Sequence, residues 1–291
     1  MKDYFQIYDL NFNPIPLPTD ELGYGLRGLD LVVSSVGEEV TEHALSKVPG
    51  YIQTGFTDRD REMSIHARLK AKDAIDFRLK RDRVFSFFKQ LGTFYVTEVQ
   101  QGNKLMKVRV SESYTFERPQ GNRTFSTAII PLKIVGQPYW ISRFKTMDLH
   151  NAGGVPFDGG WSYGMGLDVN KTTYQYENVG KFNIYNAGRP LKTIQEQDCY
   201  ITIDVNQTVT DFRLFDSTGR WFEYNPMKDG DWSLKAGDKI VLNGHYMKLN
   251  DTPIMERTNR YFIRMLSGDN QFTMQGLNNY KITFDFRFKY D

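Results

Sequence analysis

The sequence has a single cysteine, four histidines and no long uninterrupted apolar run. Cys199 has no partner for an internal disulfide, and the chain lacks the clustered Cys and His spacing of a zinc site. No segment approaches the ~18 apolar residues of a membrane span, and no apolar core of a signal peptide follows Met1. We therefore expect a soluble chain, made in a cytoplasm, whose core holds the fold without a disulfide, metal or cofactor.

An excess of charge of one sign is also absent. The sequence has 37 Lys and Arg residues against 35 Asp and Glu residues, for a net charge of +2. A protein that neutralises many phosphates usually carries a larger basic excess. Neither specific nucleic-acid binding nor a membrane partner is expected.

Sequence signatures of catalysis are missing as well. The chain has no GxSxG elbow, and its histidines are scattered, at His43, His66, His150 and His245. The glycines of residues 23–28 spell GxGxxG, but prolines precede them and a strand-like run follows, whereas a dinucleotide site needs a strand before and a helix after. We predict no catalytic, cofactor-binding or metal-binding residues and no enzymatic activity.

Aromatic residues and glycine are plentiful, and they favour sheets. Aromatics make up 14% of the chain, with 24 glycines, a composition typical of pleated, turn-rich structure. Met63–Leu69 alternates apolar and polar side chains like a strand with one solvated face. One helix is predicted at about 73–91, because Asp73 can cap its start, Asp76 follows three residues later and Gly92 ends it.

Two hairpins are predicted after this helix. The first pairs Thr93–Val99 with Leu105–Val110 across a Gly-Asn turn. The second pairs Ser113–Glu117 with Arg123–Val135, and its arms are long enough to project from the body.

The composition changes near residues 140–165, where glycine becomes frequent. Few contacts should cross such a loop-like stretch, so we predict domains at 1–145 and 146–291. The second domain shows short alternating runs and no helical period, which predicts a β-sandwich. Its predicted strands are Phe182–Tyr185, Tyr200–Asn206, Asp211–Asp216, Arg220–Tyr224, Lys239–Leu242, His245–Leu249, Tyr261–Leu266 and Lys281–Tyr290.

The order of several short segments resembles a known family. They are Arg61–Leu69 followed by the helix, Pro138-Tyr139, Asn186-Ala187-Gly188, Gly237-Asp238 and Ile282–Tyr290. In this order they are similar to the distal tail proteins (Dit) of long-tailed phages that infect Gram-positive bacteria. The resemblance implies a tail-tube-like N-terminal β domain with one helix and long hairpins, followed by a galectin-like β-sandwich.

The resemblance also implies a function. Such proteins are non-enzymatic hexameric hubs of the baseplate in the virion, assembled in the host cytoplasm. They join the tail tube to the tail-associated protein and to receptor-binding proteins, and the sandwich serves as a peripheral docking domain. We expect the ring interface to include charged and aromatic residues of the loop 46–56, the run 58–62 and the turn 118–123, namely Tyr51, Phe56, Arg59, Arg61, Arg118 and Arg123. Arg78 and Lys80 on the helix are candidates for ion pairs between subunits.

Two other functions remain open from the residues alone. A glycan-binding adhesin would stack a sugar on exposed aromatic rings, with Trp161, Trp221 and Trp232, beside Tyr163, as candidates. A glycoside hydrolase on the sandwich would need two carboxyl groups roughly 5–10 Å apart in a cleft, a separation that sequence does not measure.

Overall fold

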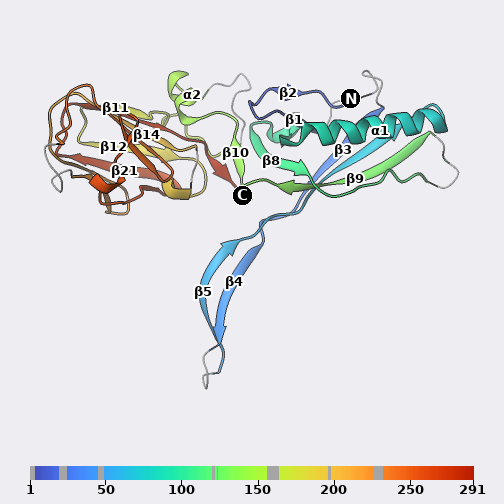
Figure 1. The fold of residues 1–291 in the computed structure, drawn as a ribbon, viewed down its shortest axis with the longest axis horizontal. Coiled ribbons are helices and arrows are strands. Elements are labelled where there is room, and N and C mark those ends of the chain that lie inside the picture. The colour runs from blue at the N-terminus through green and yellow to red at the C-terminus, as the bar shows by residue number, and fades with distance from the viewer. Residues whose placement is uncertain are drawn as a thin grey trace. The chain divides into compact units, whose positions relative to one another are not determined.

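The computed structural model describes residues 4–19, 25–44, 49–119, 122, 124–155, 164–195, 198–225 and 232–291 (Figure 1). The chain forms two compact units, Met1–Ile141 with Asp291, and Ser142–Tyr290. Antiparallel strands dominate both units, which confirms the prediction of a mainly β protein.

The first unit is built on one large antiparallel sheet. Its strands follow the order β2-β1-β7-β8-β9-β6-β3, and β10 pairs with β8. Their bounds are β1 Phe5–Tyr8, β2 Pro14–Ile15, β3 Leu26–Val33, β6 Met63–Lys70, β7 Thr93–Glu98, β8 Lys104–Val110, β9 Phe125–Ile134 and β10 Trp140–Ser142; a 3₁₀ turn, η1, spans Val99–Gln101. The predicted pairing of the strands near 93–99 and 105–110 is confirmed.

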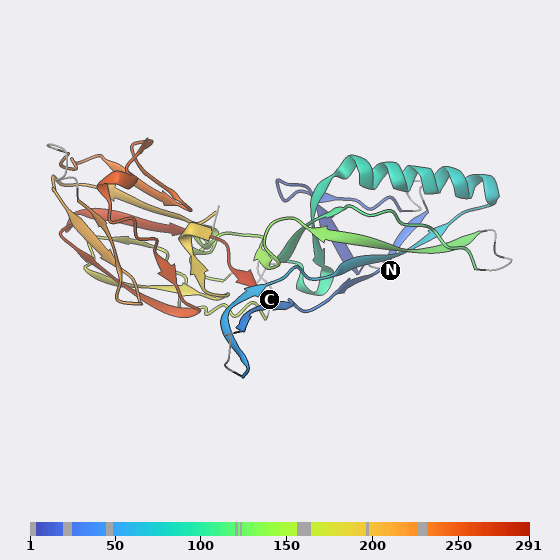
Figure 2. The same ribbon diagram turned by 60° about the horizontal axis from the view of Figure 1, so that its bottom comes forward.

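Helix α1, Ala74–Leu91, covers one face of this sheet (Figures 1 and 2). Asp73 caps it as predicted, because its carboxylate accepts hydrogen bonds from the backbone N–H groups of Ile75 and Asp76. The strand beneath alternates as its sequence predicts: Met63, Ile65, Ala67 and Leu69 are buried, while the residues between them are partly exposed. The buried row of β6 therefore faces the helix, and the other face of this strand is partly exposed.

The glycines of residues 25–28 have structural roles. Gly25 has φ +69°, and a Cβ there would lie 2.2 Å from the carbonyl oxygen of Lys70. A Cβ on Gly28 would lie 2.5 Å from the Phe5 ring. These glycines let backbone and ring approach at the start of β3, which agrees with the interpretation of this run as a turn into a strand.

The second predicted hairpin is wrong in its first half. Residues 113–117 form no strand, and only one isolated bridge joins Glu117 to Thr127. Tyr114 and Phe116 instead pack on Phe85 of α1, with ring centroids 5.1 and 6.0 Å away. Aromatic packing on the helix therefore prevails over the expected strand pairing.

The second unit has two main sheets. The six-stranded sheet has the order β11-β22-β14-β17-β18-β19, and the four-stranded sheet has the order β12-β21-β15-β16. Phe182, Phe272 and Phe284 meet between the sheets, with centroid distances of 4.9–6.0 Å, so the core of this unit is aromatic. This arrangement confirms the predicted sandwich.

The bounds of the strands and helices in this unit differ from several predicted ones. They are β11 Gln175–Glu177, β12 Lys181–Asn186, β13 Leu191–Lys192, β14 Tyr200–Val205, β15 Phe212–Phe215, β16 Trp221–Tyr224, β17 Lys239–Asn243, β18 Tyr246–Leu249, β19 Thr252–Pro253, β20 Arg264–Met265, β21 Gly268–Gln275, β22 Tyr280–Asp285 and β23 Lys289–Tyr290, with helix α2 Thr146–Asn151 and 3₁₀ turns η2 Thr193–Gln195 and η3 Met255–Arg257. Strands β11, β13, β19 and β21 and the short helix α2 were not predicted. The run 261–266 forms only the two residues of β20, and the run 281–290 is two strands.

Candidate functional site

A two-stranded arm projects from the first unit. It pairs β4, Glu38–Ala44, with β5, Tyr51–Asp58, and forms a separate sheet (Figure 1). Every residue of β4 is exposed, and β5 has only Gly55 and Asp58 partly covered. The arm is the long projecting hairpin of this unit, in place of the predicted hairpin at 113–135.

The base of the arm is tied to the body. The backbone N–H of Arg59 donates to the carbonyl of Gly37 at 2.7 Å, and that of Ser34 donates to Glu62 at 2.9 Å. The hydroxyl of Tyr139 donates to the carboxylate of Asp58 at the end of β5. These bonds continue the β3–β6 pairing to the base of the arm.

One face of the arm combines apolar and acidic side chains. Phe56 pairs with Val40, and Tyr51 pairs with Ala44, while Thr54 is an extra residue in a bulge. Because directly opposed residues share a face and β4 alternates regularly, the bulge brings Tyr51 to the same face as Val40 and Phe56. Tyr51 is 71% exposed and Phe56 66%. We call this surface the arm face, made of Glu38, Val40, Glu42, Tyr51, Gln53 and Phe56.

The predicted ring-interface residues have different environments. Tyr51 and Phe56 lie on the arm face, and Arg59 at its base forms an ion pair with Glu39 at 2.9 Å. This guanidinium holds the pKa of the Glu39 carboxyl below its usual value, through a hydrogen bond and its charge. Arg61 is buried in the body.

Two further predicted residues belong to the turn after β8. The Arg118 guanidinium lies over the Phe77 ring of α1, 4.8 Å from its centroid. Arg123 lies outside the described residues. Both arm strands were missed by sequence reasoning. Residues 51–56, expected to belong to a loop, lie in strand β5, and EEVTEHA of β4 shows no alternation.

The aromatic residues proposed for glycan stacking have protein neighbours. Trp221 donates its indole N–H to Glu223 at 3.1 Å, and its ring contacts Phe215 at 5.4 Å. The Arg257 guanidinium lies 3.5 Å from the centroid of the Trp232 ring. Trp161 and Tyr163 lie outside the described residues. The glycan-stacking set stays a prediction.

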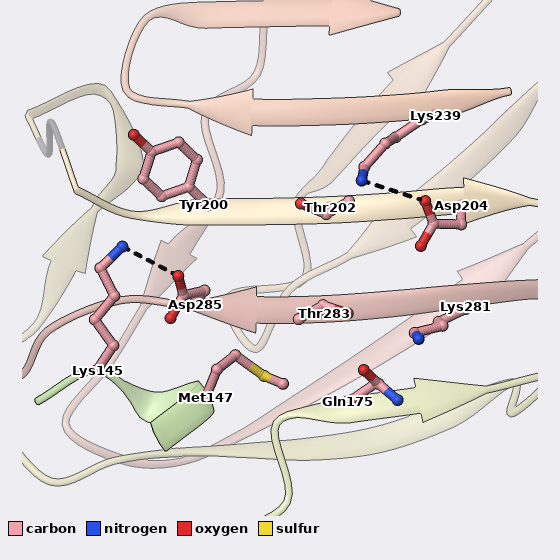
Figure 3. A pocket seen from close by; sticks show the side chains of 10 residues that line it. All are labelled: Lys145, Met147, Gln175, Tyr200, Thr202, Asp204, Lys239, Lys281, Thr283 and Asp285. Carbon is pink, nitrogen blue, oxygen red and sulfur yellow. Dashed lines mark hydrogen bonds and ion pairs between the residues drawn. The ribbon is translucent and has the colours of Figure 1, made fainter. Parts of the chain in front are cut away.

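The second unit has an open groove of about 540 Å³ on the outer face of its six-stranded sheet (Figure 3). Its charged groups are largely paired: Lys145 bonds Asp285 at 3.1 Å, and Lys239 lies 3.9 Å from Asp204. The remaining lining residues are Met147, Gln175, Tyr200, Thr202, Lys281 and Thr283. The groove is a polar surface with its own internal ion pairs.

The two carboxylates in this groove are poorly placed for glycoside hydrolysis. Asp285 opposes Tyr200 and Asp204 opposes Lys281, which puts the acids four residues apart along the strands. At ~3.3 Å per residue this is roughly 13 Å, beyond the roughly 5–10 Å that glycosidase pairs use. Among the described residues, no group of three His, Cys, Asp or Glu side chains is arranged to hold a metal. None of the described helices is long and apolar enough to cross a membrane.

Part of the first unit is similar to a domain of phage tail proteins. Residues 33–132, which include the arm, β6 and α1, match the family model of the phage tail protein RIFT-related domain. This match agrees with the predicted resemblance to phage tail proteins. No curated protein has a matching sequence.

The whole chain has the fold of a distal tail protein. It is similar to the crystal structure of the Dit protein (gp 19.1) of SPP1, described as a paradigm of the hub adsorption apparatus in phages that infect Gram-positive bacteria. The TM-score is 0.58 at 11% identity, over 98% of this chain and 99% of that one. A chain of the phage P2 baseplate in its activated conformation aligns over 99% and 98%, with 10% identity and a TM-score of 0.42.

Proposed function

We propose that the chain is the structural hub of a phage tail tip, in which six copies close a ring around an open channel. The exposed arm carries this proposal. It is supported by the phage tail domain at residues 33–132 and by the fold shared with SPP1 Dit. The protein acts through its shape, with no enzymatic step.

An isolated two-stranded hairpin is marginally stable in water, since it has no core to offset the entropy of ordering. Its free backbone edges also invite pairing with other chains. An arm with exposed Tyr51 and Phe56 is therefore suited to lie against a neighbouring copy. In a closed ring one patch meets a different patch of the next subunit, and a projecting arm provides such a contact.

The two parts of the chain have separate roles in this proposal. Residues 1–145 form the ring and join the tail tube to the tail-associated protein. Residues 146–291 are the peripheral docking domain for receptor-binding or other baseplate proteins, and the polar groove of Figure 3 is a surface for such contacts. The protein belongs to the tail tip of the virion.

Deleting the arm tests the proposal. Residues 38–58 are replaced by Asn-Gly, a two-residue turn that fits because Gly37 and Arg59 are already joined by a backbone hydrogen bond at 2.7 Å. We expect light scattering to give a sixfold mass for the intact chain, with a six-fold annulus in electron micrographs, and a monomer for the deletion. Far-UV circular dichroism and the melting temperature should change little.

Point variants give a matched comparison. Phe56→Ser removes an exposed aromatic from the arm, and Tyr246→Ser removes one of similar exposure, 66% against 55%, from the second unit. Only Phe56→Ser should weaken the ring. A monomeric intact chain at high concentration, or a ring that survives deletion of the arm, would contradict the proposal.

A further inference from the structure

The outer side of helix α1 carries an exposed apolar pair that its own unit does not cover. Ile75 is 70% exposed and Leu79 56%. They are four residues apart, so they are neighbours on the helix surface, and Arg78 lies beside them. We call Ile75, Arg78 and Leu79 the α1 stripe. Its backbone is held by the Asp73 cap at the start of the helix.

The cations of this helix are not equally available. Lys80 donates to the Lys70 carbonyl and pairs with Asp76 at 3.2 Å, and its side chain is only 13% exposed. Arg81 pairs with Asp82 at 2.8 Å. Arg78 is exposed and has no ion pair among the described residues. The α1 stripe is thus a small apolar surface with one available positive charge.

We infer that the α1 stripe receives the arm face of a second copy of this chain. This inference rests on the proposed ring and identifies the surface that the arm contacts in it. The two surfaces have complementary charge: the arm strands hold four acidic residues and no Lys or Arg, whereas α1 holds five basic residues and two acidic ones. Phe56 and Tyr51 would cover Ile75 and Leu79, and Glu38 or Glu42 would meet Arg78.

A rival surface exists on the face of β9 that points away from α1. Ile129 is 61% exposed there, and Lys133, four residues further along the same strand, pairs with Arg109. However, Ile129 opposes His66, which in turn opposes Asp30. An acidic arm would place its carboxylates near the Asp30 carboxylate, and like charges disfavour that contact. On α1 the nearest exposed acid is Asp82, whose carboxylate is paired with Arg81 at 2.8 Å.

Site-directed crosslinking distinguishes the two surfaces. Cys199 is the only native cysteine and is buried, so Cys199→Ala gives a cysteine-free chain. In this background one protein carries Gln53→Cys on the arm face and a second carries Asp82→Cys, one turn beyond Leu79. The matched control carries Ile129→Cys in place of Asp82→Cys, and both native residues are exposed.

Full-length proteins are mixed in pairs and treated with a short bismaleimide. We expect a crosslinked dimer from Gln53→Cys with Asp82→Cys, little from Gln53→Cys with Ile129→Cys, and none from single proteins. Leu79→Glu should raise the concentration for half-assembly by at least about tenfold, and Ile129→Glu by less than about twofold.

The outcomes separate this inference from the ring proposal. If the chain assembles but crosslinks through Ile129→Cys, or through neither position, the arm meets another surface and the inference fails while the ring stands. If Leu79→Glu assembles like the parent, the inference also fails. If the parent chain does not self-associate, both fail together.

Discussion

The strand pairs β3–β6 and β4–β5 form an inner and an outer half of one segment of the first unit, and the two halves have opposite environments. In the inner half, β3 pairs with β6, and alternate side chains such as Ile65 are fully buried under α1. In the outer half, β4 pairs with β5 by the same kind of backbone ladder, and no side chain is buried. The two halves therefore share a backbone pattern but differ in packing, and the aromatic residues of the outer half are not buried by their own unit.

Truncating one side chain in each half should give the largest difference in the free energy of unfolding. Ile65→Ala is expected to cost about 2–5 kcal/mol of unfolding free energy, because it opens a cavity in a packed core. Phe56→Ala should change it by less than about 0.5 kcal/mol in the monomer, since the ring is already in water. Chemical denaturation at a concentration that keeps both variants monomeric measures the two values. A similar loss in both would show that the arm packs on its own body.

Alkaline pH should destabilise the packed sandwich. Burial raises the pKa of Tyr280 to about 12 and raises the pKa values of Tyr174 and Tyr290 in the same unit. An unfolded tyrosine ionises near pH 10, so the unfolded state loses protons first. This stability is complete below about pH 10 and is lost as pH rises toward 12, by up to about 2–3 kcal/mol for Tyr280.

Tyrosinate absorbance and circular dichroism followed between pH 9 and 12.5 check this expectation. Tyr280→Phe keeps the ring and removes the titrating group, so it should flatten part of the pH dependence. A pH dependence identical to that of the parent chain would exclude Tyr280 as a contributor.

The helix that covers the inner half depends on its cap. Asp73→Ala removes the acceptor for two backbone N–H groups and should cost about 1 kcal/mol. Asp73→Asn keeps a capping side chain and should recover most of it. Thermal melts of the three proteins measure the difference, and equal melting temperatures for Ala and Asp would contradict the capping role.

The smallest effect is expected at the base of the arm. Arg59→Gln breaks the exposed pair with Glu39, so the pKa of Glu39 should rise toward its usual value while the melting temperature stays unchanged. Carboxyl NMR titration of Glu39 follows the pKa directly. An unchanged pKa would show that the ion pair does not form in solution, and a lower melting temperature would show that it supports the body.

Much of the fold follows from local patterns in the sequence. The alternation of Met63–Leu69 and the cap at Asp73 each need only neighbouring residues, and both are confirmed. Strand β21 was missed because GDNQFTMQ is rich in residues that favour turns, yet it pairs with β12 along six residues and supplies the buried Phe272. Tertiary pairing here overrides local preference.

The candidate site, too, could be predicted from the sequence only in part. The sequence alone determines that Tyr51 and Phe56 lie in an acidic, aromatic segment and that no disulfide is available. Only the tertiary structure shows that this segment is an uncovered arm, that Arg61 is buried in the body and that Arg118 packs on Phe77. The physical reason is that hydrophobic and charge patterns are local, whereas burial depends on which distant segments meet.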